Sequence, residues 1–217
     1  MIYNLLGENR LILDGTTYSN IEYEKQFAAI KDEGTKKHKA HLDAVFQTLD
    51  NSEMYAIEAK LLEWKNSPKN LAAAYLKEAM YLPANTVSKT FIDYFYSLID
   101  QKQDQAGRYK HKKKRYDAIQ MTIHILGPYN HFAEMTTPSV KKLTLLNVVW
   151  KYDCDEYETE VKEAIEYLSD ANSVFAPLFK QIGIDFSIQY STFQDFKKRI
   201  DFSNDPKRLE YLKRYDV

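Results

Sequence analysis

The strongest constraint on the fold is a pair of strand-like runs that flank a short polar turn. In the run His41–Leu49, apolar and polar residues alternate, which is the period of a half-buried β-strand. Residues 50–52, Asp-Asn-Ser, have the composition of a tight turn. The chain then returns in a largely apolar run over Met54–Leu62. Together the three segments predict an antiparallel β-hairpin.

Three charged residues interrupt these two runs. Asp43 lies in the first run, and Glu58 and Lys60 lie two residues apart in the second. A buried charge that lacks a partner costs roughly 3–5 kcal/mol, so charges inside a buried strand need a reason. Five other acid-x-Lys triplets occur in the chain, all in polar stretches. The Glu58 triplet is therefore a candidate site because it lies in an apolar run, and not because of its residue types alone.

The pairing of the hairpin decides whether the three charges meet. If Leu49 lies opposite Met54, Asp43 lies opposite Lys60. Directly opposed residues, and residues two apart on one strand, point to the same face of a sheet. We therefore expect Asp43, Glu58 and Lys60 on one face. A slip by one residue would move Asp43 to the other face.

The rest of the chain predicts a mixed α/β protein in one domain, residues 1–217, with a core of about residues 20–190 and a C-terminal helical segment over 191–217. Helices are expected at Ser19–Asp32, Asn70–Leu82, Val87–Asp100, Arg115–Leu126 and Glu156–Ala171. The Arg115–Leu126 helix is expected to stop at Gly127-Pro128. Strands are expected at Leu143–Trp150 and Phe186–Tyr190, reached through helical crossovers.

Composition excludes several classes of protein. The single cysteine, Cys154, rules out an intramolecular disulfide and a cysteine-based zinc site. No apolar stretch approaches the roughly 18 residues that a membrane-spanning helix needs, and the N-terminus lacks the basic region of a signal peptide. We therefore expect a cytoplasmic protein. A net charge of −1 gives no global field that would attract nucleic acid or a membrane.

Charge is nevertheless concentrated locally. The nine residues Gly107–Arg115 carry six formal positive charges. Two interpretations stay open: a solvated loop that leads into a helix, or a strip that contacts phosphates. The candidate nucleic-acid contacts are Lys110, Lys112, Lys113, Lys114, Arg115 and, on the following helix, Gln120. His124 shares a helical face with Gln120, but its isoleucine neighbours favour a buried histidine over a ligand contact.

With Asp43 on one strand and Glu58-x-Lys60 on the next, the chain resembles the PD-(D/E)xK nuclease superfamily, which has the restriction-endonuclease-like fold. The resemblance covers roughly residues 20–190 and depends on these three residues and the order of the elements. The Arg115–Gly127 helix and the strand after it are also similar to elements that follow the core motif in some of these families. Leu42 stands where the family signature has proline.

This resemblance implies a mixed β-sheet core flanked by helices, and a nuclease that uses a metal ion to hydrolyse DNA phosphodiester bonds in restriction or repair. DNA, or alternatively RNA, is the expected partner. Many such enzymes act as homodimers, so that two sites cut two strands. No membrane partner is expected.

The resemblance also implies a role for each site residue. Asp43 and Glu58, with the backbone carbonyl of Ala59, would bind Mg²⁺, for which Mn²⁺ would substitute. Lys60 would orient the attacking water and stabilise charge on the phosphate. An acid from the preceding helix, for which Glu24 is the first choice, would complete the metal site. Such chemistry suits these residue types, since Mg²⁺ prefers carboxylates and retains waters.

Two alternatives stay open. The three charges could form a structural ion pair across the hairpin. For the whole chain, the alternative is a non-catalytic module on the same fold: a nucleic-acid-binding module with a vestigial site, or a protein-interaction module. Salt-sensitive DNA binding would distinguish the nuclease and the nucleic-acid-binding module from a protein-interaction module. Metal-dependent cleavage would distinguish the nuclease from the non-catalytic binding module.

Overall fold

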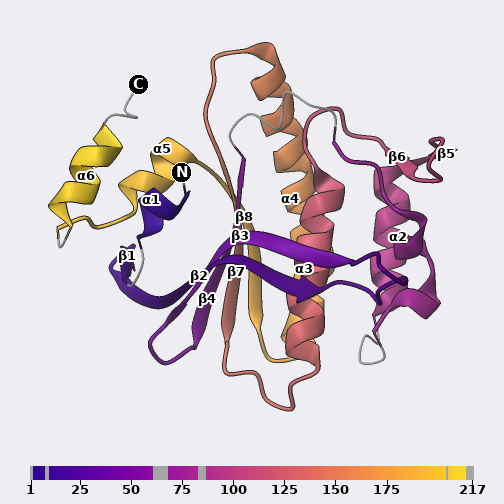
Figure 1. The fold of residues 1–217 in the computed structure, drawn as a ribbon, viewed down its shortest axis with the longest axis horizontal. Coiled ribbons are helices and arrows are strands. Elements are labelled where there is room, and N and C mark those ends of the chain that lie inside the picture. The colour runs from indigo at the N-terminus through magenta and orange to yellow at the C-terminus, as the bar shows by residue number, and fades with distance from the viewer. Residues whose placement is uncertain (1, 8–9, 61–67, 83–86, 204, 214–217) are drawn as a thin grey trace.

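A six-stranded mixed sheet forms the centre of the protein (Figure 1). The computed structural model describes residues 2–7, 10–60, 68–82, 87–203 and 205–213. The strands, in their order across the sheet, are β1 (Leu11–Leu13), β2 (Thr16–Ala28), β3 (Lys39–Thr48), β4 (Glu53–Lys60), β7 (Lys142–Val149) and β8 (Asp185–Thr192). Strands β1 to β4 pair antiparallel, whereas β4, β7 and β8 run parallel.

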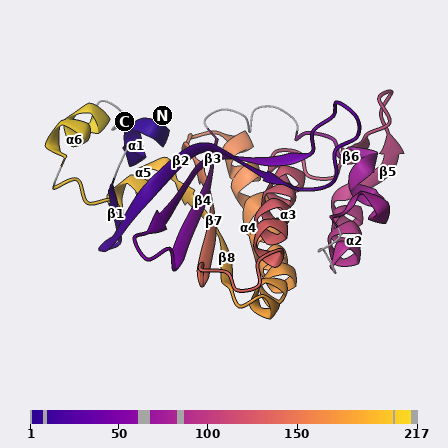
Figure 2. The same cartoon turned by 60° about the horizontal axis from the view of Figure 1, so that its bottom comes forward.

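Helices cover both faces of this sheet (Figures 1 and 2). One face carries α3 (Ala118–Ala133) and α4 (Asp155–Gln181), with α2 (Ser88–Leu98) packed outside α3. The other face carries α1 (Ile2–Leu6), α5 (Phe193–Lys198) and α6 (Pro206–Lys213). Two apolar cores result because side chains of a strand alternate: Met54 and Ala56 enter the α3–α4 core, Tyr55 and Ile57 the other.

Both parallel connections run through a helix on the same face. The chain passes from β4 to β7 by way of α3, and from β7 to β8 by way of α4. The carboxyl ends of the three parallel strands therefore lie at one edge of the sheet. That edge is where ligands bind in open α/β sheets. A small second sheet, β5 (Ile99–Gln103) with β6 (Tyr109–His111), lies beside α2.

The expected hairpin is confirmed, but its register differs by two residues. Met54 pairs with Gln47 rather than with Leu49. The turn is longer than expected because side chains at its ends hydrogen-bond to its backbone. Thr48 Oγ1 accepts the N–H of Glu53 at 3.1 Å, and Asp50 Oδ1 accepts the N–H of Ser52. A shift by two residues leaves every side chain on its expected face.

The segment Ser19–Asp32 is not a helix; it is occupied largely by strand β2, so that prediction is wrong. The spacing of Ile21, Phe27 and Ile30 imitates a helical period. Between Asn20 and Gln26, however, every second residue is exposed, which is the period of a strand. Tertiary pairing with β3 therefore overrides the apparent helical pattern.

Two irregularities bend β2. Asn20 and Glu24 have left-handed φ angles of 51° and 53°, and the pairing with β3 shifts between Ser19 and Glu22. Such bulges increase strand twist and bending. The distal half of the β2–β3 pair consequently lies across α3, as the two ribbon views show (Figures 1 and 2).

Three helix predictions are corrected in length or type. The Asn70–Leu82 segment contains two 3₁₀ turns, η2 (Ala73–Leu76) and η3 (Glu78–Met80), instead of one helix. Helix α3 continues through Gly127-Pro128, and α4 extends ten residues beyond its expected end at Ala171 to Gln181. Helix α2 and strands β7 and β8 are confirmed.

Gly127 is a packing residue rather than a helix stop. A Cβ at this position would lie 2.6 Å from the Cβ of Ala40 and 2.9 Å from the Cβ of Phe27. Only glycine lets α3 approach the β2–β3 pair this closely. The position of α3 over the hairpin, which the site requires, therefore depends on Gly127.

Candidate active site

Glu58 and Lys60 lie at the carboxyl end of β4 and are buried, with 6% and 8% of their surfaces exposed. Gln120 of α3 bridges them. Its Nε2 donates to Glu58 Oε1 at 2.7 Å, and its Oε1 accepts from Lys60 Nζ at 2.7 Å. The two charges themselves are 4.0 Å apart. Because the amide turns its donor to the anion and its acceptor to the cation, both charges are held in fixed positions.

The start of α3 positions Gln120. Asp117 caps the helix, with Oδ1 accepting the backbone N–H of Gln120 at 2.9 Å. Its Oδ2 accepts the backbone N–H of Lys69 at 3.3 Å. His111 Nε2 lies 3.3 Å from the N–H of Ile119 and accepts it. The first turn of the helix is thus fixed over β4.

Asp43 reaches the same strand from β3. Its Oδ2 accepts the backbone N–H of Ala59 at 2.6 Å. The last regular β3–β4 pair is Ala44 with Ile57, so the register places Asp43 level with Glu58 rather than opposite Lys60. The structure therefore brings the three charged residues to one end of the hairpin, with the Asp43 carboxylate on the backbone between Glu58 and Lys60.

His124 lies one helical turn after Gln120 and is 3% exposed. Its Nδ1 is 3.5 Å from Glu58 Oε2 and makes no hydrogen bond with any residue that the structure describes. Burial, helped by the charge of Lys60, lowers the pKa of His124 to about 3. The imidazole is therefore neutral near pH 7, and Lys60 is the cation beside Glu58.

Glu160 of α4 is a buried acid that the sequence analysis missed, with 1% of its surface exposed. Its Oε2 accepts the hydroxyl of Tyr190 at 2.7 Å. Burial raises the pKa of Glu160 to about 7, although the Tyr190 hydrogen bond and the charge of Lys60 both lower it. A signal was present, because Tyr157, Glu160 and Ala164 share the apolar face of the helix at a spacing of three and four.

A row of polar residues connects Glu58 to Tyr190 across the sheet. Glu58 pairs with Asn147 of β7, and Asn147 pairs with Tyr190 of β8. Asn147 is fully buried, and its Nδ2 donates to the backbone carbonyl of Glu58 at 3.1 Å. The site thus spans the ends of all three parallel strands.

Glu24 does not occupy the expected helix; it belongs to β2 and is exposed. It lies between the pairs Tyr23–Ala44 and Lys25–Leu42, and hence opposite Asp43. Among the residues that the structure describes, no three His, Cys, Asp or Glu side chains gather closely enough to hold a metal ion. The donors that remain are two carboxylates and a backbone carbonyl, a set that suits Mg²⁺ with waters completing its shell.

The basic strip is attached to α4. The Glu163 carboxylate accepts the backbone N–H groups of Lys114, Arg115 and Tyr116, each at 2.9 Å. Burial would raise the pKa of Glu163, but these three donors outweigh burial and lower it. Lys113 Nζ also pairs with Glu166, at 2.5 Å.

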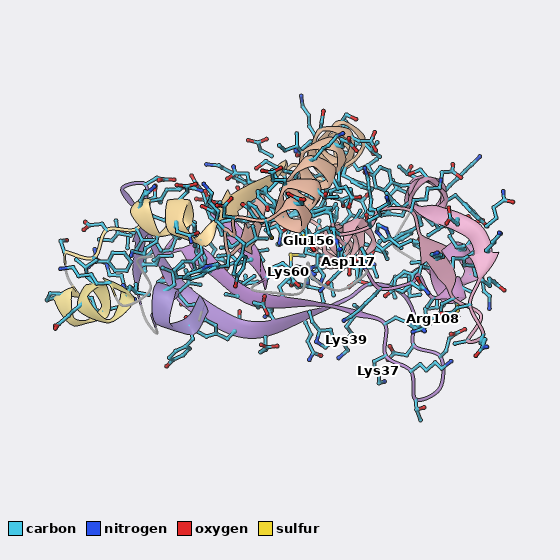
Figure 3. The ribbon with its side chains drawn as sticks, turned by 90° about the horizontal axis from the view of Figure 1, so that it is seen from above. Lys37, Lys39, Lys60, Arg108, Asp117 and Glu156 are labelled. Atoms are coloured by element: carbon cyan, nitrogen blue, oxygen red, sulfur yellow. The ribbon has the colours of Figure 1, made fainter. Side chains whose placement is uncertain are left out.

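The remaining strip residues differ in their surroundings. Lys112 Nζ donates to the carbonyl of Ser97 at 2.8 Å, whereas Lys110 is exposed on β6. Gln120, expected as a nucleic-acid contact, lies between Glu58 and Lys60 instead. In the view from above, Lys60, Asp117 and Glu156 project onto the centre of the molecule (Figure 3).

Comparisons with known proteins identify no relative of this chain. A scan against protein-family models and searches of curated proteins and of solved structures found no match. Within the described ranges, no helix is long and apolar enough to cross a membrane.

Proposed function

We propose that this chain is a metal-dependent nuclease that hydrolyses DNA phosphodiester bonds. The observation that carries the proposal is the hydrogen-bonded chain Glu58–Gln120–Lys60, in which both charged residues are buried. Asp43 accepts the backbone N–H of Ala59, the residue between the two charges. Apolar residues would fill this space at lower cost, because buried ion pairs are frequently no more stable than an apolar replacement. Retained buried charges at the carboxyl ends of parallel strands favour a chemical role.

In this proposal Asp43, Glu58 and the carbonyl of Ala59 would hold Mg²⁺. The ion, when bound, supplies a Lewis acid and a water of lowered pKa. Gln120 holds Lys60 so that its ammonium group can stabilise negative charge on the phosphate. His124 is neutral and adds no competing positive charge.

Within the mixed α/β class, we propose the restriction-endonuclease-like fold, and three features of the architecture support it. An antiparallel hairpin carries the acid and the acid-x-Lys triplet, and the next strand, β7, returns parallel to β4 through α3. Helices on both faces complete the layers.

The proposal is tested by incubating supercoiled plasmid and single-stranded DNA with the protein in Mg²⁺, Mn²⁺ or EDTA. We expect cleavage in both metals, none in EDTA, and a loss of at least about 100-fold in Asp43→Asn and Glu58→Gln, since electrostatic groups in hydrolytic sites contribute at this level. Lys180→Met, on the distant end of α4, is the control for altered surface charge. Cleavage that survives both carboxylate substitutions would refute this site.

A non-catalytic nucleic-acid-binding module is the second candidate. It is favoured by one observation, the absence of a three-ligand metal cluster in the described part of the chain. In that case the folded protein would bind DNA in a salt-sensitive way and would leave every substrate intact in both metals.

A further inference from the structure

Two adjoining hollows open beside the β5–β6 hairpin, and the larger one reaches the start of α4. One measures about 690 Å³ and the other about 550 Å³, and they share Pro68, Asn70 and Lys110. Both fall in the size range of ligand pockets in proteins. Since the shared residues line both, a chain-like ligand could pass from one hollow to the next.

The smaller hollow is strongly basic. Its lining includes Lys69, Lys102, Arg108 and Lys110, against the single acid Asp104. Arg108 and Lys110 belong to the basic run 107–115, whereas Lys69 comes from the loop before η2 and Lys102 from β5. The fold therefore adds two separate lysines to part of the run. The larger hollow, by contrast, sets its lysines against the acids Asp100, Asp155 and Glu156.

The acid of the smaller hollow, Asp104, hydrogen-bonds to its neighbours in the β5–β6 hairpin and to Asn70. Its carboxylate accepts from the backbone N–H of Arg108, from Asn70 Nδ2 at 3.0 Å, and from Arg108 Nε at 2.9 Å. These bonds, led by the Arg108 backbone N–H, lower the pKa of Asp104 to about 2. Its charge is therefore balanced locally by Arg108.

Three lysines remain without such a balance. The side chains of Lys69, Lys102 and Lys110 are exposed, and they make no hydrogen bond or ion pair with another described residue. Lys113 of the strip differs, because it pairs with Glu166. The smaller hollow thus joins Lys110 of the strip to Lys69 and Lys102, all three without an acidic partner among the described residues.

Two hydrogen bonds to Asp117 connect the smaller hollow to the candidate site. Lys69 donates its backbone N–H to Oδ2 of Asp117, whose Oδ1 holds the N–H of Gln120. Gln120 in turn accepts from Lys60, so that Asp117 connects the residues beside Lys60 with Lys69 of the hollow. Its label falls between those of Lys60 and Arg108 in the view from above (Figure 3). A strand with one phosphate at Lys60 could therefore continue past Asp117 toward the hollow.

We propose that the hollow lined by Lys69, Lys102, Arg108 and Lys110 binds the phosphate backbone of a nucleic-acid strand, one or more nucleotides from the phosphate that Lys60 contacts. The second part of this statement rests on the proposed hydrolysis. Binding by the hollow does not. Phosphates neutralised by lysine release counterions, so such binding has a steep dependence on salt.

The test measures the anisotropy of fluorescein-labelled single-stranded and duplex DNA of about 20 nucleotides, a length suited to several phosphate contacts, in EDTA and across a series of salt concentrations. Lys102→Ala/Lys110→Ala removes two exposed charges of the hollow. Lys162→Ala/Lys180→Ala removes two exposed charges from α4 and is the matched control.

The hollow variant should bind about tenfold more weakly, with a salt slope smaller in magnitude by about 1 to 2, while the control stays near the wild type. An unchanged slope in the hollow variant would overturn the proposal, as would a wild type that binds neither DNA. Binding that depends on the hollow, followed by no cleavage after Mg²⁺ is added, would overturn only the proposed hydrolysis.

Discussion

Ala59 donates its backbone N–H to Oδ2 of Asp43 over 2.6 Å, from β4 to a side chain of β3. Regular pairing of the two strands ends just before this contact, at Ala44 and Ile57. The Asp43 carboxylate therefore extends the hairpin with a side-chain acceptor and fixes the backbone at the centre of the acid-x-Lys triplet. One carboxylate serves both the fold and the proposed metal site.

Substitutions of Asp43 should separate these two roles. Asp43→Asn keeps an oxygen that can accept the Ala59 N–H, so the free energy of unfolding should change by less than about 1 kcal/mol. Asp43→Ala removes the acceptor and should cost about 1–3 kcal/mol. Both variants should lose cleavage, because neither carries the negative charge. Urea unfolding of the three proteins would contradict this account if the asparagine variant were as unstable as the alanine variant.

Gln120 should matter for stability as well as for position. Gln120→Leu removes the bridge and leaves Glu58 and Lys60 buried without it, at an expected cost of about 1–3 kcal/mol in the free energy of unfolding. Met121→Leu, at the next and fully buried position of α3, conserves volume and should cost less than about 1.5 kcal/mol. Equal stability of Gln120→Leu and the wild type would mean that the bridge contributes nothing to the fold.

Glu160 predicts a specific pH dependence of stability. Its pKa is about 7 in the folded protein and 4.5 in a model peptide. A raised carboxyl pKa gives stability that is complete below the unfolded value and is lost as pH rises through the folded value. Glu160→Gln does not titrate and can still accept the Tyr190 hydroxyl. Relative to the wild type, the variant should therefore gain about 2–3 kcal/mol between pH 4.5 and pH 8.

The measurement for Glu160 is the free energy of unfolding of both proteins at several pH values. Other groups, including His124, titrate in both and cancel in the difference. A difference that does not change between pH 4.5 and pH 8 would show that Glu160 has an ordinary pKa.

Gly127→Ala should destabilise the protein, since its Cβ would meet Ala40 and Phe27 at under 3.0 Å. Forcing a methyl group into such a contact typically costs about 1–3 kcal/mol. Because the substitution pushes α3 away from the hairpin, cleavage should fall as well. Thermal unfolding checks the first effect, and a stable Gly127→Ala variant would show that α3 can shift freely.

The sequence predicted the hairpin and the later strands well because their signals are local. Alternation in His41–Leu49 and the polar turn after it are enough to define β3 and β4. The register error is two residues, so the parity of the pairing is the expected one. Residues 61–62, included in the expected second strand, lie outside the described residues.

The errors came from interactions that a local pattern does not contain. Strand β2 was predicted to be a helix. Its alternation of exposed and less exposed residues depends on pairing with β3 and on the bulge after Ser19, which a local pattern does not contain. The stop expected at Gly127 was wrong because that glycine serves packing between α3 and the hairpin. Both are tertiary effects that override propensity.

The candidate site was only partly predictable for the same reason. Asp43, Glu58 and Lys60 stand out in one short stretch of sequence, but Gln120 and Glu160 reach the site from separate helices. The basic hollow is a sharper case, because its lysines lie on separate segments of the chain. The sequence analysis identified Lys110 within the contiguous strip, but it did not identify Lys69 or Lys102. Another part of the strip is attached to α4.

The most direct measurement is nicking of supercoiled plasmid in Mg²⁺ by the wild type and by Lys60→Met, with folding of both checked by thermal unfolding. Methionine keeps the length of the side chain and removes its charge. The account predicts nicking by the wild type that EDTA abolishes and that a folded Lys60→Met variant lacks. Equal nicking by the two proteins, or a folded wild type that leaves the plasmid intact in both Mg²⁺ and Mn²⁺, would contradict it.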